Sequence, residues 1–123
     1  MKTAVYFHVP LDSRWEQARA QEEAKRFLES RPELSLTRTY SDFGPSAGSR
    51  RALLSLLRDA GTGAFQALVL TAPNAVAREP SEILEILGYL SGKGVRILFS
   101  SGKEYPLRYW ARQYARMKRE LAS

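Results

Sequence analysis

The hydrophobic and polar positions of this chain follow two periods, one typical of strands and one typical of helices. Residues 3–9 are almost all β-branched, aromatic or apolar and stop at Pro10, which lacks a ladder donor, so they predict a buried strand. Residues 33–40 alternate apolar and polar side chains and predict a second strand. Residues 64–70 and 95–100 are mostly apolar runs that fit central strands of a parallel sheet.

Apolar residues at helical spacing lie between these strands. Residues 14–30 predict a helix that Asp12 or Ser13 can cap, residues 53–60 predict a second, and residues 80–92 predict a third that starts at a proline. Strands that alternate with helices indicate βαβ units with right-handed crossovers. We therefore expect an α/β fold with a parallel sheet of about four strands, helices on both faces and a C-terminal helix.

The C-terminal segment carries two surfaces. Its apolar residues recur at spacings of 3, 4, 3 and 4, as in a heptad seam: Leu107, Trp110, Tyr114, Met117 and Leu121. A separate stripe has spacings of 4, 4 and 3: Arg108, Arg112, Arg116 and Arg119. In one interpretation the seam packs on the chain's own sheet and the arginines are solvated. In the other, the seam is a dimer interface and the arginines form a phosphate-facing side of the helix.

Composition narrows the classes of function. The chain has 123 residues with 44% apolar content, so we expect one domain over residues 1–123 and no separate DNA-binding domain. It has no cysteine, which excludes thiol nucleophiles, thiolate zinc sites and disulfides and fits a cytoplasmic location. The formal net charge is +6, and residues 103–123 hold six basic against two acidic residues, a net of +4. That excess favours an anionic partner.

No segment predicts a cofactor, a metal or a membrane. His8 is the only histidine, so a histidine metal site cannot form. Residues 46–49 lack the glycine-lysine-serine ending of a phosphate loop, and the glycines at 61 and 63 precede a strand where nucleotide fingerprints follow one. No run reaches the roughly 18 apolar residues that a membrane span needs. A pairing of His8 with Ser13 would lack the third group of a hydrolase site.

Several motifs, taken together, resemble the catalytic domain of serine recombinases, the resolvase and invertase family. Residues 6–12 read Tyr-Phe-His-Val-Pro-Leu-Asp, where the family has Tyr-x-Arg-Val-Ser-Thr-Asp. Residues 42–47 and 50–57 are similar to the family's Asp-x-Gly-x-Ser-Gly loop and the leucine-rich helix after it. Residues 74–78 stand where the family has Asp-Arg-Leu-Ser-Arg, and residues 94–99 resemble its glycine-valine strand. The resemblance implies a flavodoxin-like sheet and a dimer helix that contacts DNA.

The family's site residues are mostly replaced. In the family a serine hydroxyl attacks a DNA phosphate while arginines stabilise the developing charge. The matching positions are Pro10 for the serine, His8 for the arginine before it, Asn74 for the acid and Ala75 for the arginine after it, while Arg50 and Arg78 are retained. A hydroxyl from Ser13, Ser46 or Ser49 is a minor alternative nucleophile. The resemblance therefore implies a resolvase-like domain that is catalytically inactive.

Three functions remain open. The first is a DNA-associated or regulatory role with weak, non-specific DNA affinity, as a homodimer or paired with a related recombinase. The second is a homodimeric protein-interaction or small-anion-binding module with no DNA role. The third is an enzyme whose anionic substrate is held by Arg50 and Arg78. The fold alone does not distinguish these functions, because function depends on the residues of the site.

Overall fold

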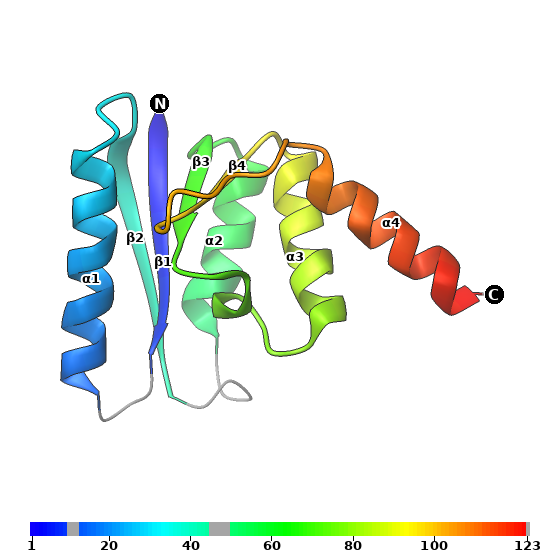
Figure 1. The fold of residues 1–123 in the computed structure, drawn as a ribbon, viewed down its shortest axis with the longest axis horizontal. Coiled ribbons are helices and arrows are strands. Elements are labelled where there is room, and N and C mark those ends of the chain that lie inside the picture. The colour runs from blue at the N-terminus through cyan, green and yellow to red at the C-terminus, as the bar shows by residue number, and fades with distance from the viewer. Residues whose placement is uncertain (10–12, 45–49, 123) are drawn as a thin grey trace.

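The computed structural model describes residues 1–9, 13–44 and 50–122 (Figure 1). Within them, strands and helices alternate along the chain as the sequence predicts. The elements are β1 (Lys2–Val9), α1 (Arg14–Glu29), β2 (Ser35–Phe43), α2 (Arg51–Gly61), β3 (Ala67–Leu70), the short 3-10 helix η1 (Pro73–Ala75), α3 (Pro80–Gly92), β4 (Arg96–Phe99) and α4 (Tyr109–Ala122). No helix in these ranges is both long and apolar enough to cross a membrane.

The four strands form one parallel sheet in the order β2-β1-β3-β4. β1 is central and pairs along its whole length with β2, with one register shift between Thr3 and Ala4. Because all strands are parallel, their carboxyl ends meet at one edge of the sheet, where parallel α/β proteins place their functional groups. That edge holds the ends of β1 and β2 and the start of α2 (Figure 1).

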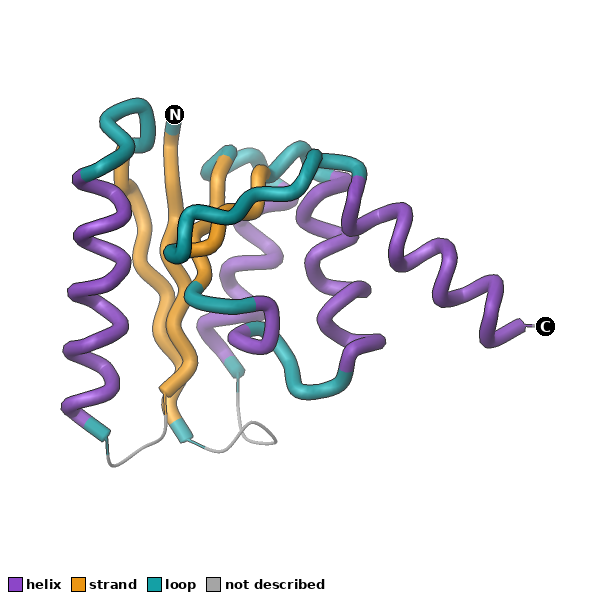
Figure 2. The backbone as a smooth tube through the Cα atoms, viewed as in Figure 1, coloured by secondary structure: helices purple, strands orange, loops and turns teal. Residues whose placement is uncertain are grey.

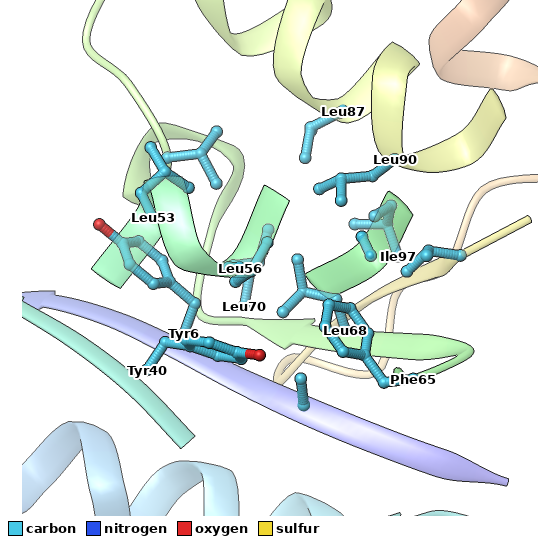
Figure 3. Close-up of a cluster of buried hydrophobic side chains, with 14 of the residues drawn as sticks. Tyr6, Tyr40, Leu53, Leu56, Phe65, Leu68, Leu70, Leu87, Leu90 and Ile97 are labelled. Atoms are coloured by element: carbon cyan, nitrogen blue, oxygen red, sulfur yellow. The ribbon is translucent and has the colours of Figure 1, made fainter. Parts of the chain in front are cut away.

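The sheet is covered on both faces, as expected (Figures 1 and 2). α1 packs on one face, where Phe27 joins Val5 and Val69 in one buried cluster. α2 and α3 pack on the other face, where a larger cluster includes Tyr6, Leu56, Leu68, Leu87 and Leu90 (Figure 3). Each fully buried leucine contributes roughly 1.5–3 kcal/mol to folding, so this larger cluster holds α2 and α3 to the sheet. The expected α/β fold class with a parallel, flavodoxin-like sheet is confirmed.

α4 packs against α3 at its first turns and then leaves the body of the protein (Figure 1). Trp110 is its only buried residue among those described, and it lies edge-on to Phe99 at the end of β4, with ring centroids 6.1 Å apart. The backbones approach closely at Gly88, where a Cβ would lie 3.5 Å from the Trp110 carbonyl oxygen and the Tyr114 Cβ. The helix is therefore fixed at its N-terminal end.

Predicted boundaries differ from the structure at several elements, most clearly at the end of β2 and the start of β3. β2 runs to Phe43, three residues beyond the predicted end at Tyr40, because its partner β1 provides backbone hydrogen-bonding groups along that length. The first three residues of the predicted loop at 41–49 are therefore strand, and residues 45–49 lie outside the described part of the chain. β3 begins at Ala67 and not at Ala64, because the Ala64 amide donates to the Asp59 carbonyl in the turn that ends α2.

Candidate functional site

Polar side chains converge at the carboxyl edge of the sheet. His8 comes from the end of β1, Asp42 from the end of β2, and Arg50 from the residue just before α2. His8 and Asp42 are opposite each other in the parallel β1–β2 pair. The structure therefore brings together three positions that lie far apart in the sequence.

His8 and Arg50 are hydrogen-bonded to each other. His8 Nε2 lies 2.9 Å from the Gly44 carbonyl oxygen, which can only accept, so Nε2 carries the proton. Nδ1 lies 2.6 Å from Arg50 Nη2, which can only donate, so Nδ1 accepts. The contact with Arg50 requires the neutral ring, because a protonated Nδ1 cannot accept a hydrogen bond. Burial, and then the nearby Arg50 charge, hold the pKa of His8 below its ordinary value.

Arg50 is also bonded to the backbone on its other side. Its Nη1 donates to the carbonyl oxygen of Val76, in the segment between η1 and α3. Its Nε is buried and has no hydrogen-bond partner among the described residues. The guanidinium thus links the end of β1 to the segment after β3.

Asp42 anchors the start of α2. One carboxylate oxygen accepts from the Ala52 amide at 2.9 Å; the other accepts from the Leu53 amide at 2.9 Å and from the Tyr6 hydroxyl at 2.9 Å. These amides belong to the first turn, which has no intrahelical acceptors. Burial, and then the bond to the Asp42 carboxylate, raise the pKa of Tyr6. Asp42 is a buried strand residue, and its position nine residues before the first residue of α2 gave no local sequence signal for this role.

The candidate residues that follow β3 differ in their exposure to solvent. Asn74 is exposed, and Ala75 packs against the larger core cluster. Arg78 is exposed and shares with Arg50 the lining of a pocket of about 260 Å³, to which Glu79 and Glu82 also contribute. The two retained arginines therefore lie on one pocket, but its lining carries acidic groups as well.

The remaining candidate nucleophiles are placed only in part. Ser13 is the N-cap of α1, where its Oγ accepts from the Glu16 amide at 3.1 Å, so it performs a capping role. Pro10, Ser46 and Ser49 lie outside the described residues. In the part that the structure describes, no three histidine, aspartate or glutamate side chains are grouped as metal ligands would be.

The arginine stripe of α4 is exposed along its whole length. Helical geometry puts Arg108, Arg112 and Arg119 on the side of α4 opposite Trp110 and Tyr114, which face α3. Arg116 lies beside them and pairs with Glu120 at 3.2 Å, with both side chains largely exposed. Surface pairs of this kind are weak, so the stripe keeps its positive charge available to an anionic partner.

The apolar seam divides into two parts. Trp110 is buried in the chain's own core, and Tyr114 is half-buried beside Gly88 of α3. Met117 is half-buried, whereas Leu107 and Leu121 are 42% and 75% exposed. Trp110 is therefore part of the core of its own chain. The end of the seam at Leu121 is exposed, so a partner can contact it.

Comparison with known proteins agrees with this geometry. The family model described as the resolvase N-terminal domain matches residues 4–122. No protein with a curated description matches. Several solved structures share the fold. The N-terminal catalytic domain of TP901-1 integrase has a TM-score of 0.76 at 16% identity, with full coverage of both chains. A resolvase family site-specific recombinase from Streptococcus pneumoniae has a TM-score of 0.75 at 17% identity, with 99% of this chain and 90% of that chain covered. A serine recombinase from Sulfolobus solfataricus has a TM-score of 0.60 at 20% identity, with 97% and 95% covered.

The four-stranded parallel sheet and the helices that cover it have the fold of serine recombinase catalytic domains. The chain belongs to the resolvase family.

Proposed function

We propose that this chain is a catalytically inactive member of the resolvase family that acts in the cytoplasm by binding DNA. The observation that carries the proposal is the bonded pair of His8 and Arg50. Arg50 donates to His8 Nδ1 and to the Val76 carbonyl, so two of its nitrogens are already engaged within the protein. Pro10, at the position of the family's nucleophile, has no hydroxyl. Neither the attacking group nor a ready phosphate clamp is in place.

DNA binding is assigned to the arginine stripe of α4. Arg112, Arg116 and Arg119 lie on the exposed side of α4, and Arg108 is exposed just before its first residue. The helix projects from the body, so a duplex can approach these arginines without meeting the sheet (Figure 1). Each phosphate that a cation neutralises releases counterions, which makes such binding dependent on salt. We further propose that the domain binds as a homodimer or beside a related recombinase subunit.

The test is a fluorescence anisotropy titration of a labelled mixed-sequence duplex at two salt concentrations. We expect weak binding whose logarithmic salt slope falls by about 3–4 when Arg108, Arg112, Arg116 and Arg119 are all changed to alanine. The matched control changes four basic residues of α1 to alanine: Arg14, Arg19, Lys25 and Arg26. It removes the same charge but leaves α4 intact. Equal loss in both variants would reject the stripe as the binding surface.

A second candidate function rests on the exposed end of the apolar seam. Leu121 is 75% exposed next to half-buried Met117, which suits a protein partner such as a second copy of the chain. In this function the module dimerises and DNA has no role. Sedimentation equilibrium would show a dimer that Leu121→Asp dissociates, with no duplex affinity at low salt. Trp110 is unsuitable for this test because its substitution would also open the core.

A further inference from the structure

A platform of aromatic side chains lies where α4 begins. The rings of Tyr105 and Tyr109 are stacked, with centroids 4.4 Å apart and planes 17° apart. Trp110 lies edge-on to both, at 5.5 Å from Tyr105 and 4.9 Å from Tyr109. Trp110 is in turn packed on Phe99 of the core, so the tyrosine pair is supported from beneath. Tyr105 remains 38% exposed.

The platform stands at the N-terminal end of the arginine stripe. Tyr109, Arg112 and Arg116 occupy positions i, i+3 and i+7 and therefore lie along one side of α4. Arg108, immediately before Tyr109, is exposed, and so is Lys103, two residues before Tyr105. The arginines along α4 and the stacked rings of Tyr105 and Tyr109 therefore form one continuous surface.

Glu104, the one acidic residue between Lys103 and Arg119, is paired with an arginine. Glu104 forms a two-pronged ion pair with Arg96 of β4, with Arg96 Nε to Oε2 at 2.7 Å and Nη2 to Oε1 at 2.8 Å. Bonding to Arg96 holds the pKa of Glu104 below its ordinary range, so the pair persists at neutral pH. The same residue pairs by backbone with Leu98, which fixes the loop before α4 against the sheet edge. The loop that carries Tyr105 is therefore held to β4, and the exposed residues Lys103 and Arg108 near it are basic.

We propose that this surface binds single-stranded DNA, with a base stacked on the Tyr105–Tyr109 pair and the neighbouring phosphates held by Arg108 and Arg112. The inference rests on the proposed DNA role of α4 and goes beyond it. Arginines alone hold the phosphates of a duplex as well as those of a single strand, whereas an aromatic platform needs a base face that only an unpaired strand offers. Aromatic stacking with a basic track is the combination by which proteins bind single strands without reading their sequence.

The test compares three labelled probes: an oligothymidylate of about 15 nucleotides, an abasic strand of the same length, and a duplex. The abasic strand has the same phosphates but no bases, so it isolates stacking. We expect oligothymidylate to bind more tightly than the abasic strand. Tyr105→Ala should weaken oligothymidylate binding about five-fold or more and leave abasic and duplex binding unchanged. Tyr105→Phe should retain the wild-type affinity.

Tyr89→Ala is the matched control, because Tyr89 is an exposed tyrosine of α3 whose hydroxyl donates to the Leu57 carbonyl of α2. A Trp15→Phe background leaves Trp110 as the single tryptophan, since the chain has two. A cooperative urea transition of free Tyr105→Ala, followed by Trp110 emission in this background, would show that the core beneath the platform is intact.

Two results would overturn the inference and spare the proposed function: equal binding of oligothymidylate and the abasic strand, or an equal effect of Tyr105→Ala on all three probes. A Tyr105→Ala variant that changes the oligomeric state would assign the platform to a protein partner instead. Failure of all three probes to bind wild-type protein would reject both proposals together.

Discussion

At the scale of single residues, His8 changes what Arg50 can do. A cationic side chain at position 8 would repel the Arg50 guanidinium, whereas a neutral imidazole supplies an acceptor for it. Arg50 is consequently turned toward β1 and the Val76 carbonyl and holds two parts of the fold together. A residue that the family resemblance associates with phosphate is used here as a structural link.

The His8–Arg50 bond makes stability dependent on pH. The pKa of His8 is lowered in the folded protein from 6.5, so below pH 6.5 the unfolded chain takes up a proton that the folded chain resists. Stability should therefore fall as pH drops from about 6.5 toward the folded pKa, and level off below it. Urea unfolding at several pH values would measure this. His8→Asn can still offer Arg50 an oxygen acceptor and does not titrate, so it should lose that part of the pH dependence.

Asp42 is the side chain whose change should cost most at the carboxyl edge. Asp42→Asn replaces one acceptor oxygen by a donor facing an amide or hydroxyl donor, and should lower the free energy of unfolding by about 2–3 kcal/mol. Asp59→Asn is the control: Asp59 also accepts from a tyrosine, Tyr40 at 2.7 Å, but is partly exposed and should cost less than about 1 kcal/mol. Urea denaturation of both variants would measure the two losses in free energy of unfolding. Similar losses would mean that burial does not set the strength of these bonds.

At the scale of elements, the sequence predicts which segments are helices and strands better than where they end. The period of apolar residues identifies α1, α2 and α3 and the four strands, because it reflects the face that each element buries. The end of β2 depends instead on the length of β1, a partner about 34 residues away in the sequence. Local composition around Ser41 and Phe43 contains no trace of that pairing.

The heptad spacing of α4 illustrates the same limit. It correctly indicates an apolar side on the helix, but spacing does not say which surface covers that side. In the structure Trp110 meets Phe99 of the same chain, while Leu121 lies beyond the body. The first interpretation of the seam therefore holds for Trp110, whereas the dimer interface stays a prediction for the exposed end of the helix.

The close approach of α3 and α4 at Gly88 sets a size limit. A Cβ there would make ordinary contacts at 3.5 Å, so Gly88→Ala should fit and stabilise α3 by about 0.5–1 kcal/mol. Gly88→Leu would push α4 away and should cost about 1–3 kcal/mol. Urea unfolding, with Trp110 emission followed in the Trp15→Phe background, reports both effects. A leucine variant as stable as the alanine variant would contradict the described packing.

At the scale of the whole molecule, the proposed loss of catalysis involves several residues. Pro10→Ser restores a hydroxyl in the sequence, but His8 still binds Arg50, and Asn74 and Ala75 still replace the family's acid and arginine. We expect neither wild type nor Pro10→Ser to form a covalent link to supercoiled DNA, as judged by denaturing gel shift. Each missing phosphate contact removes several kcal/mol of transition-state stabilisation, so one hydroxyl is not enough. A covalent product from Pro10→Ser alone would show that the rest of the site is competent.

The sequence indicated which positions to examine as a candidate site, but it did not indicate which side chains would contact one another. Strand ends in the sequence identified His8, and the family resemblance identified Arg50, Asn74 and Arg78. That Arg50 would bond to His8 and Val76 depends on side-chain directions across three elements, which no spacing along the chain encodes.

The attachment of α4 at one end has a consequence for how it moves. Its first turn is held by Trp110, whereas none of residues 111–122 is buried. Backbone amides should therefore exchange with deuterium in a gradient along the helix, slowest near α3 and fastest toward Ala122. Any ligand that orders the outer turns loses part of its binding free energy to that ordering, at about 1–2 kcal/mol for each backbone unit fixed. Substitutions that raise the helix propensity of the C-terminal turns of α4 should therefore increase affinity at this surface, even if they add no contact with the ligand.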